Sequence, residues 1–305
     1  MPIPNRIPRR SRSMLFVPAT RWNMIEKAAS SATDAICLDL EDSVAPAEKP
    51  AARANVARAL RELDFGQRTR ILRINALDTP YAYRDLIEVA ETAGATLDLI
   101  MLPKVESPAH VQFIDTLLTQ IELAHGFEPG RIGIEAQIET ASGCLHVAAI
   151  AAASPRLEAL IYGPGDFAAS MRMPLANIGE ADQHDALYPG HRWHYVMQSI
   201  VVAARAHDLR CMDGPYAAFR DTEGLEQACQ IARALGFDGK QCIHPAQLEI
   251  VNRLFAPSAA EIAWAEQVVA AYQEALLRGD GAIRIGDRMI DMASIRMAQT
   301  IIDSR

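Results

Sequence analysis

The feature that most constrains the fold of this chain is a regular alternation of short apolar segments with longer segments of helical period. The alternation continues almost from one end of the sequence to the other. The eight apolar segments predicted as strands are 14–18, 35–40, 70–75, 97–103, 131–139, 157–163, 210–215 and 239–244. The helices predicted between and after them are 22–32, 48–63, 81–94, 107–125, 141–153, 192–207, 222–235 and 246–254. This order is typical of parallel strands joined by crossover helices.

Eight strand–helix units predict an α/β protein with a (β/α)₈ barrel over residues 1–255. The alternative is an open, doubly wound sheet. That fold commonly carries a glycine-rich phosphate-binding turn after its first strand, but residues 18–23 read PATRWN and contain no glycine. After residue 255 the pattern changes to a helix, a hairpin turning near Gly286-Asp287 and a final helix. We therefore expect residues 256–305 to form a C-terminal extension.

Composition narrows the class of partner. The chain has 305 residues, half of them apolar, and a net charge of −8 with its basic residues scattered. This charge disfavours nucleic acid and membrane surfaces, so small molecules are the expected partners. We predict no membrane span and no signal peptide. The five cysteines are odd in number and show no C-x-x-C spacing, which predicts a reduced, cytoplasmic protein without a zinc site.

Polar side chains follow most of the predicted strands. In a barrel of this type the active site lies at the carboxyl ends of the strands, so these residues are its candidates. In chain order they are Asp39, Glu41, Asp42, Arg73, Asn75, Lys104, Glu106, Glu135, Gln137, Glu139, Asp166, Asp213 and His244. Gly163 and Gly165, in the sequence GPGDFAAS, would let the backbone approach a ligand beside Asp166.

Each candidate also has a structural interpretation. The acids at 39, 41 and 42 could cap the following helix and pair with Arg73 or Lys104. Glu135 and Gln137 lie deeper along their strand and are more typical of hydrogen bonding inside the barrel, and His244 of packing before a proline. The functional interpretation is favoured because acids from the second, fifth and sixth strands and an arginine from the third would lie together at one end of the barrel.

Oxygen ligands on rigid strand ends suit Mg²⁺, which keeps several waters and needs few protein ligands. We predict Glu139 and Asp166 as the metal ligands. Arg73 can then hold a substrate carboxylate through paired hydrogen bonds.

At these residues the chain resembles the citrate lyase β-subunit-like proteins, which include malyl-CoA and citramalyl-CoA lyases and belong to the HpcH/HpaI aldolase superfamily. The resemblance covers most of the chain. Its segments are RSMLFVPATRWNMIEKA (12–28), DAICLDLEDSVAPAEKPAAR (34–53), RIN (73–75), LPKVES (102–107), QIET (137–140), YGPGDFAASM (162–171), LGFDGKQCIHPAQLEIVNRLFAPS (235–258) and RMIDMASIRMAQTII (288–302).

The resemblance implies a barrel of the phosphoenolpyruvate/pyruvate type, assembled as a homotrimer or a pair of trimers, that uses Mg²⁺, or Mn²⁺ in its place, and a CoA or acyl-carrier thioester. It also implies roles for individual residues. Glu139 and Asp166 fall on the metal ligands, Arg73 on the arginine that holds the 2-oxo acid, and Asp39, Glu41 and Asp42 on acids that bind the metal's waters. Asp291 falls on an acid that enters a neighbouring subunit's active site.

Weaker correspondences concern CoA. Arg12, Arg21 and Lys27 would contact its phosphates, and the segment Ile243-His244-Pro245 would lie along the pantetheine. The loop 171–195 carries three of the eight histidines and corresponds to no known substrate specificity. The sequence therefore does not identify the acyl group of the substrate.

The predicted activity is reversible cleavage of a 3-hydroxyacyl-CoA, such as malyl-CoA or citramalyl-CoA, to an acyl-CoA and a 2-oxo acid. Asp291 is its predicted acid/base. The alternatives are a citrate lyase β subunit that acts on a carrier-bound citryl thioester, a CoA-independent, metal-dependent aldolase, and a metabolite-binding subunit without turnover.

Overall fold

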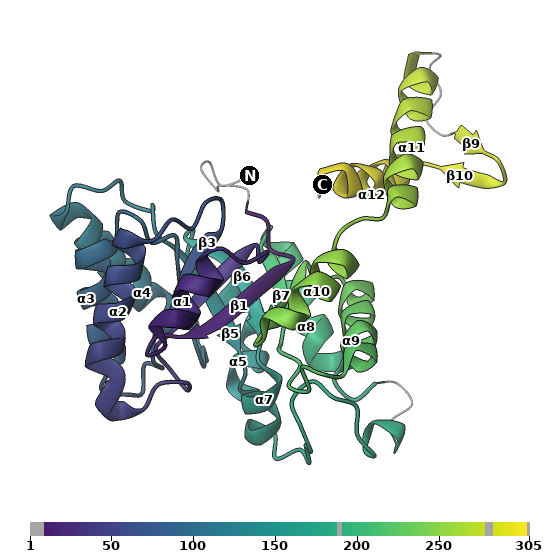
Figure 1. Cartoon of the computed structure of the whole chain (residues 1–305). Coiled ribbons are helices and arrows are strands. Elements are labelled where there is room, and N and C mark those ends of the chain that lie inside the picture. The colour runs from purple at the N-terminus through teal and green to yellow at the C-terminus, as the bar shows by residue number, and fades with distance from the viewer. Residues whose placement is uncertain (1–8, 188–190, 278–282, 304–305) are drawn as a thin grey trace. The chain divides into compact units, whose positions relative to one another are not determined.

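Eight parallel strands close into a barrel in the order β1 to β8, with β8 hydrogen-bonded to β1 (Figure 1). The computed structural model describes residues 9–187, 191–277 and 283–303. The strands are β1 (Ser13–Pro18), β2 (Ala35–Asp39), β3 (Thr69–Arg73), β4 (Leu99–Leu102), β5 (Gly133–Ile138), β6 (Leu157–Tyr162), β7 (Arg210–Asp213) and β8 (Gly239–Cys242). The predicted (β/α)₈ barrel is confirmed.

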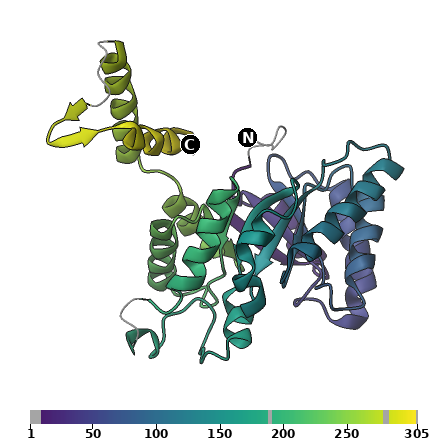
Figure 2. The same ribbon diagram turned by 180° about the vertical axis from the view of Figure 1, so that it is seen from behind.

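Helices surround the barrel, as the two opposite views show (Figure 1, Figure 2). They are α1 (Trp22–Ala29), α2 (Lys49–Glu62), α3 (Ala82–Ala93), α4 (Pro108–Ala124), α5 (Ala141–Leu145), α6 (Val147–Ala151), α7 (Pro164–Ser170), α8 (His194–Ala206), α9 (Thr222–Leu235) and α10 (Leu248–Phe255). Short 3₁₀ turns are η1 (Pro46–Glu48), η2 (Asp185–Leu187) and η3 (Pro245–Gln247). The helix predicted at 141–153 is divided at His146, whose ring nitrogen Nδ1 lies 2.9 Å from the carbonyl oxygen of Glu106.

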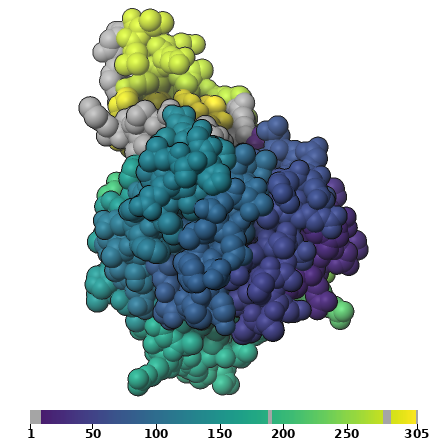
Figure 3. All heavy atoms as spheres, turned by 90° about the vertical axis from the view of Figure 1, so that its left-hand side faces the viewer, coloured from purple at the N-terminus to yellow at the C-terminus, as the bar shows by residue number. Residues whose placement is uncertain are grey.

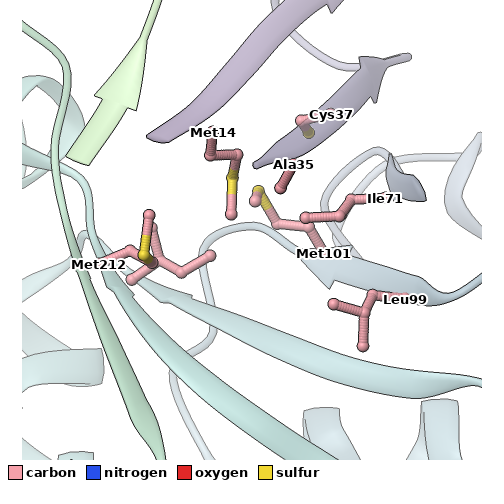
Figure 4. Close-up of a cluster of buried hydrophobic side chains, with 8 residues drawn as sticks. Met14, Ala35, Cys37, Ile71, Leu99, Met101 and Met212 are labelled. Atoms are coloured by element: carbon pink, nitrogen blue, oxygen red, sulfur yellow. The ribbon is translucent and has the colours of Figure 1, made fainter. Parts of the chain in front are cut away.

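The interior of the barrel contains an apolar cluster. Alternate residues of the strands point inward, and their side chains meet near the axis (Figure 4). The cluster consists of Met14, Ala35, Cys37, Ile71, Leu99, Met101, Ile161 and Met212. On the face shown in Figure 3, the side chains of α2, α3 and α4 form a continuous outer surface. All five cysteines lie among the described residues, are buried and form no disulfide.

Beneath this apolar layer, a buried ion pair fills the barrel near the amino ends of the strands. Oε1 of Glu135 accepts a hydrogen bond of 3.1 Å from Arg210, which also bonds Glu158 at 3.1 Å. Burial raises the pKa of Glu135 to about 7, although the charge of Arg210 opposes the rise. Glu135 therefore makes a structural contact, which agrees with the hydrogen-bonding interpretation of its position.

Replacing Glu135 by glutamine is expected to make folding stability less sensitive to pH. The raised pKa means that the folded protein binds more protons at this site than the unfolded chain between pH 4.5 and about 7. Wild-type stability is therefore lost over that range as the pH rises. The stability of Glu135→Gln relative to wild type should grow from pH 5 to pH 8 by up to about 3 kcal/mol, measured by urea unfolding. Glu62→Gln, an exposed carboxylate on α2, is the control, and parallel pH curves for Glu135→Gln and wild type would contradict the expectation.

Residues 253–305 form a second compact unit, and residues 1–252 form the first. The second contains α11 (Ala259–Leu277), the antiparallel pair β9 (Ile283–Ile285) and β10 (Arg288–Ile290), and α12 (Met292–Asp303). Its own small core is built on Ala265, Val268, Ile290 and Ala298. Gly286 turns the hairpin with a positive φ of 57°, at the predicted position. None of the described helices has the length and apolarity that a membrane crossing requires.

Candidate functional site

A pocket of about 430 Å³ lies at the carboxyl ends of the strands and is lined by seven of the predicted site residues. Its walls also contain Phe16 and Ile178, which the sequence analysis did not assign to the site, and Gln137, a candidate that it interpreted as hydrogen-bonded inside the barrel. The predicted residues that line it are Asp39, Asp42, Arg73, Glu139, Gly165, Asp166 and Ile243. Residues at the ends of β2 and β3, and residues that follow β5, β6 and β8, thus meet at one mouth of the barrel, as its topology requires.

Arg73 and Asp39 form a two-point ion pair at one side of this pocket. The two residues are neighbours in the ladder between β2 and β3. Nε and Nη2 of Arg73 donate to the two carboxylate oxygens of Asp39 at 2.7 and 2.8 Å, and Nη1 lies 3.0 Å from Oε2 of Glu41. Burial tends to raise the pKa of Asp39, but the arginine charge holds it below its usual range. The pair therefore fixes the plane of the guanidinium.

Glu139, just beyond β5, is the most deeply buried acid of the pocket. Its side chain is 1% exposed; Oε1 accepts from the backbone N–H of Lys104 at 2.8 Å and Oε2 from Gln137 at 2.6 Å. A Cβ atom at Gly163 would lie 2.4 Å from Oε2, so only glycine allows this approach. Burial, together with the negative charge of Glu41, raises the pKa of Glu139 to about 8. A cation bound to this carboxylate would offset the free energy needed to keep it charged in a buried place.

Asp166 lies in the first turn of α7, and its side chain is partly exposed. With Glu139 it supplies two oxygen donors to one pocket. Among the described residues, no three histidine, cysteine or acidic side chains are grouped as a metal cage. Two carboxylates with space for water and a substrate oxygen fit Mg²⁺, which uses few protein ligands. The buried, electrostatically strained Glu139 is the observation that supports this fit.

The predicted CoA contacts do not all reach the pocket. Arg12 precedes β1 and lies at the amino end of the barrel, where it donates to both oxygens of Asp34 at 2.8 and 2.7 Å. The prediction for Arg12 therefore conflicts with its position, because a residue before a strand lies at the end opposite the active site. Arg21 precedes α1 and Lys27 lies in its last turn; both are exposed.

The segment after β8 is held in place beside the pocket. Backbone N–H groups of Ile243 and His244 donate to the side chain of Gln247 at 2.9 and 3.2 Å. The His244 ring stacks on Phe219 with 4.4 Å between ring centroids, and its Nδ1 accepts from the backbone of Ala246. His244 is therefore packed and hydrogen-bonded, as its structural interpretation stated, while Ile243 lines the pocket. Pro245 begins η3.

Asp291 belongs to the second compact unit, directly before α12. Oδ1 accepts hydrogen bonds from the backbone N–H groups of Ser294 and Ala293 at 3.0 and 2.9 Å. These bonds, that of Ser294 first, lower the pKa of Asp291. The exposed carboxylate is thus ionised at neutral pH and able to accept a proton.

The loop 171–195 contributes a wall of the pocket. The side chain of Ile178 lies against Gly165, and its backbone oxygen accepts from Ala217 at 2.9 Å. Arg192 braces the loop through ion pairs with Asp182 and Asp185 at 3.0 and 2.9 Å. No periodic pattern in the sequence marks Ile178, because its position depends on this loop path.

Comparison with known proteins gives consistent matches. The model of the family described as HpcH/HpaI aldolase/citrate lyase matches residues 12–245. An L-malyl-CoA/beta-methylmalyl-CoA lyase of Cereibacter sphaeroides is 43% identical over 96% of this chain and 94% of that protein. A (3S)-malyl-CoA thioesterase of the same species is 39% identical over 94% and 92%. The crystal structure of protein CitE from Mycobacterium tuberculosis, in complex with magnesium, acetoacetate and coenzyme A, is 33% identical, with a TM-score of 0.76 over 96% of this chain and 97% of that one.

Proposed function

The chain belongs to the HpcH/HpaI aldolase/citrate lyase family, as its sequence resemblance predicted, and we propose that it cleaves and forms the carbon–carbon bond of a 3-hydroxyacyl-CoA such as malyl-CoA. The products of cleavage are an acyl-CoA and a 2-oxo acid. The observation that carries the proposal is the meeting of Glu139, Asp166 and Arg73 in one pocket at the carboxyl end of the barrel. The near full-length similarity to a malyl-CoA lyase supports the same reaction class.

Glu139 and Asp166 would hold Mg²⁺, or Mn²⁺ in its place. When bound, the ion supplies Lewis-acid stabilisation of the oxygen charge that develops as the bond breaks. The Lys104 amide and Gln137 orient the Glu139 carboxylate for this purpose. Asp39, Glu41 and Asp42 would order water around the ion.

Arg73 would bind the carboxylate of the 2-oxo acid, with Gly165 and Asp166 beside it. Two edges of its guanidinium already contact Asp39 and Glu41, so the group is held in one plane before substrate arrives. A preorganised donor loses little entropy on binding, and this orients the substrate over the metal ligands.

Asp291 of a neighbouring subunit would complete the site as acid/base. In cleavage the ionised Asp291 takes the hydroxyl proton, the carbon–carbon electrons move to the α-carbon of the acyl-CoA, and protonated Asp291 returns the proton to that carbon. In condensation the ionised carboxylate removes the same proton. Its lowered pKa keeps the carboxylate in the ionised form that can accept this proton. The role requires a homo-oligomer, for which we propose a trimer or a pair of trimers.

CoA would lie across the mouth of the pocket. Ile243, His244 and Pro245 would contact the pantetheine, and Arg21 and Lys27 the phosphates. Buried cysteines that form no disulfide fit a reducing compartment, so the proposal includes a location in the cytoplasm.

A direct assay tests the reaction. The protein is incubated with Mg²⁺, acetyl-CoA or propionyl-CoA, and glyoxylate or pyruvate, and products are identified by mass. We expect a 3-hydroxyacyl-CoA from at least one pair, and none after metal chelation. Release of the free hydroxy acid would indicate an added thioesterase step, for which the thioesterase relative gives reason to look. Cleavage only of a carrier-bound citryl thioester, or only of free hydroxy acids without CoA, would contradict the proposal in favour of its alternatives.

A further inference from the structure

An ammonium group lies among the acids of the pocket. Nζ of Lys104 is 2.6 Å from Oε1 of Glu41, 3.6 Å from Oδ2 of Asp166 and 3.9 Å from Oδ1 of Asp42. Glu41 and Asp42 follow β2, Lys104 follows β4, and Asp166 follows β6. One side chain therefore joins segments from three different strand ends.

The backbone of Lys104 also has an uncommon conformation. Its φ is +49°, in the left-handed region that L-residues rarely adopt. In this conformation its N–H donates to Oε1 of Glu139 at 2.8 Å. Lys104 thus contacts Glu139 through its backbone and Glu41 and Asp166 through its side chain. Strained backbone of this kind is concentrated at functional sites.

The amine and the metal need the same carboxylate. Asp166 is one of the two metal ligands in the proposed function, and it is also a contact of the Lys104 ammonium. Two cations a few ångströms apart repel each other strongly in a partly buried site. The shorter contact of Lys104, with Glu41, involves no proposed metal ligand. The amine can therefore leave Asp166 and keep its stronger partner.

We propose that Lys104 is a resident counter-cation, which stabilises the acidic cluster without metal and competes with the divalent ion for Asp166. The inference rests on the proposed function, because it takes Glu139 and Asp166 as the ligands. When metal enters, the ammonium withdraws toward Glu41. The chain thereby lowers its own affinity for divalent metal and keeps the cluster folded when metal is absent.

Metal binding without turnover tests this role. Lys104→Asn removes the amine and introduces a residue that tolerates a positive φ, and Lys104→Met removes the amine but keeps an unbranched side chain. Metal-free protein is titrated with Mn²⁺ and free ion is followed by electron paramagnetic resonance. Both variants should bind Mn²⁺ roughly tenfold tighter or more, as removal of a nearby like charge predicts. Thermal unfolding should show a lower Tm for the metal-free variants and a larger rise with Mg²⁺ than in wild type.

Controls separate this inference from the assignment on which it rests. Arg58→Gln removes a positive charge on the exposed surface of α2, outside the residues that line the pocket, and should leave Mn²⁺ affinity unchanged. If Glu139→Gln binds Mn²⁺ as tightly as wild type, the ligand assignment is wrong. If Glu139→Gln loses the metal but both Lys104 variants bind it with unchanged or weaker affinity, the ligands are right and the competition is overturned. Tighter Mn²⁺ binding in the methionine variant alone would also overturn the competition, because both substitutions remove the same charge.

Discussion

Replacing Glu139 by glutamine is expected to remove the divalent-metal site and nearly all lyase activity together. The substitution keeps the size of a side chain that is 1% exposed. A glutamine oxygen can still accept from the Lys104 amide. Its amide nitrogen can donate to Oε1 of Gln137 once the Gln137 amide turns over, because Nε2 of Gln137 faces this position in wild type and Oε1 has no hydrogen-bond partner among the described residues. What disappears is the negative charge that holds the ion. We expect kcat/KM to fall by roughly 10³-fold or more, since a principal electrostatic contribution to the transition state is lost.

The decisive measurement pairs kcat/KM with Mn²⁺ affinity and a Tm of the metal-free protein. Glu106→Gln is the matched control, because this exposed carboxylate follows β4 near the pocket but does not line it. A Glu139→Gln protein that keeps metal affinity and activity would reject the ligand assignment. If Glu139→Gln lost activity because it failed to fold, the Tm of the metal-free variant would fall far below that of wild type.

Mixing two inactive variants is expected to restore activity if the site is shared between subunits. Asp291→Ala should retain metal binding and lose most turnover, by roughly 10²-fold to 10⁴-fold, because it lacks the acid/base. Subunits of Asp291→Ala and Glu139→Gln, unfolded and refolded together, place an intact barrel beside an intact extension in some oligomers. Random assembly of equal amounts should recover about one quarter of wild-type activity, since each half of a site is intact in half of the subunits.

A second mixture provides the control. Arg73 and Glu139 lie in the same barrel and line the same pocket. Mixed Arg73→Met and Glu139→Gln subunits should therefore recover nothing. Equal recovery in both mixtures would mean that subunits do not share sites in the proposed way. Full activity of Asp291→Ala alone would show that another group transfers the proton.

The fold was predictable because each buried strand reads as a short apolar run between helices of clear period. All predicted strand bounds lie within two residues of the observed ones. The differences fall mostly at the carboxyl ends. The predicted third strand, for example, extends to Asn75, two residues beyond Arg73, where β3 ends and presents a side chain to the pocket. The break at His146 was not predictable, because its ring contacts a carbonyl from the β4 loop, a tertiary interaction.

The positions of the site residues followed from topology more than from local pattern. Glu139 and Asp166 lie after strands, and a closed barrel brings all such ends together, so the sequence located them correctly. The same rule indicates that Arg12, before its strand, belongs to the opposite end. The left-handed backbone of Lys104 has no local signal, since it depends on a hydrogen bond to Glu139, 35 residues away in sequence. The roles proposed for these residues remain predictions.

The anchoring of Ile178 has a consequence for how this enzyme could acquire new substrates. The acids that perform the chemistry belong to strand ends, where a shift would disturb the barrel. Part of the pocket wall beside Gly165 comes instead from a loop that is stabilised by its own ion pairs. Exchange of residues 175–181 between relatives would alter the volume offered to the substrate without touching Glu139, Asp166 or Arg73. Reactivity and substrate size can therefore diverge separately in evolution, and a mutant library directed at this segment would explore selectivity at little risk to the reaction itself.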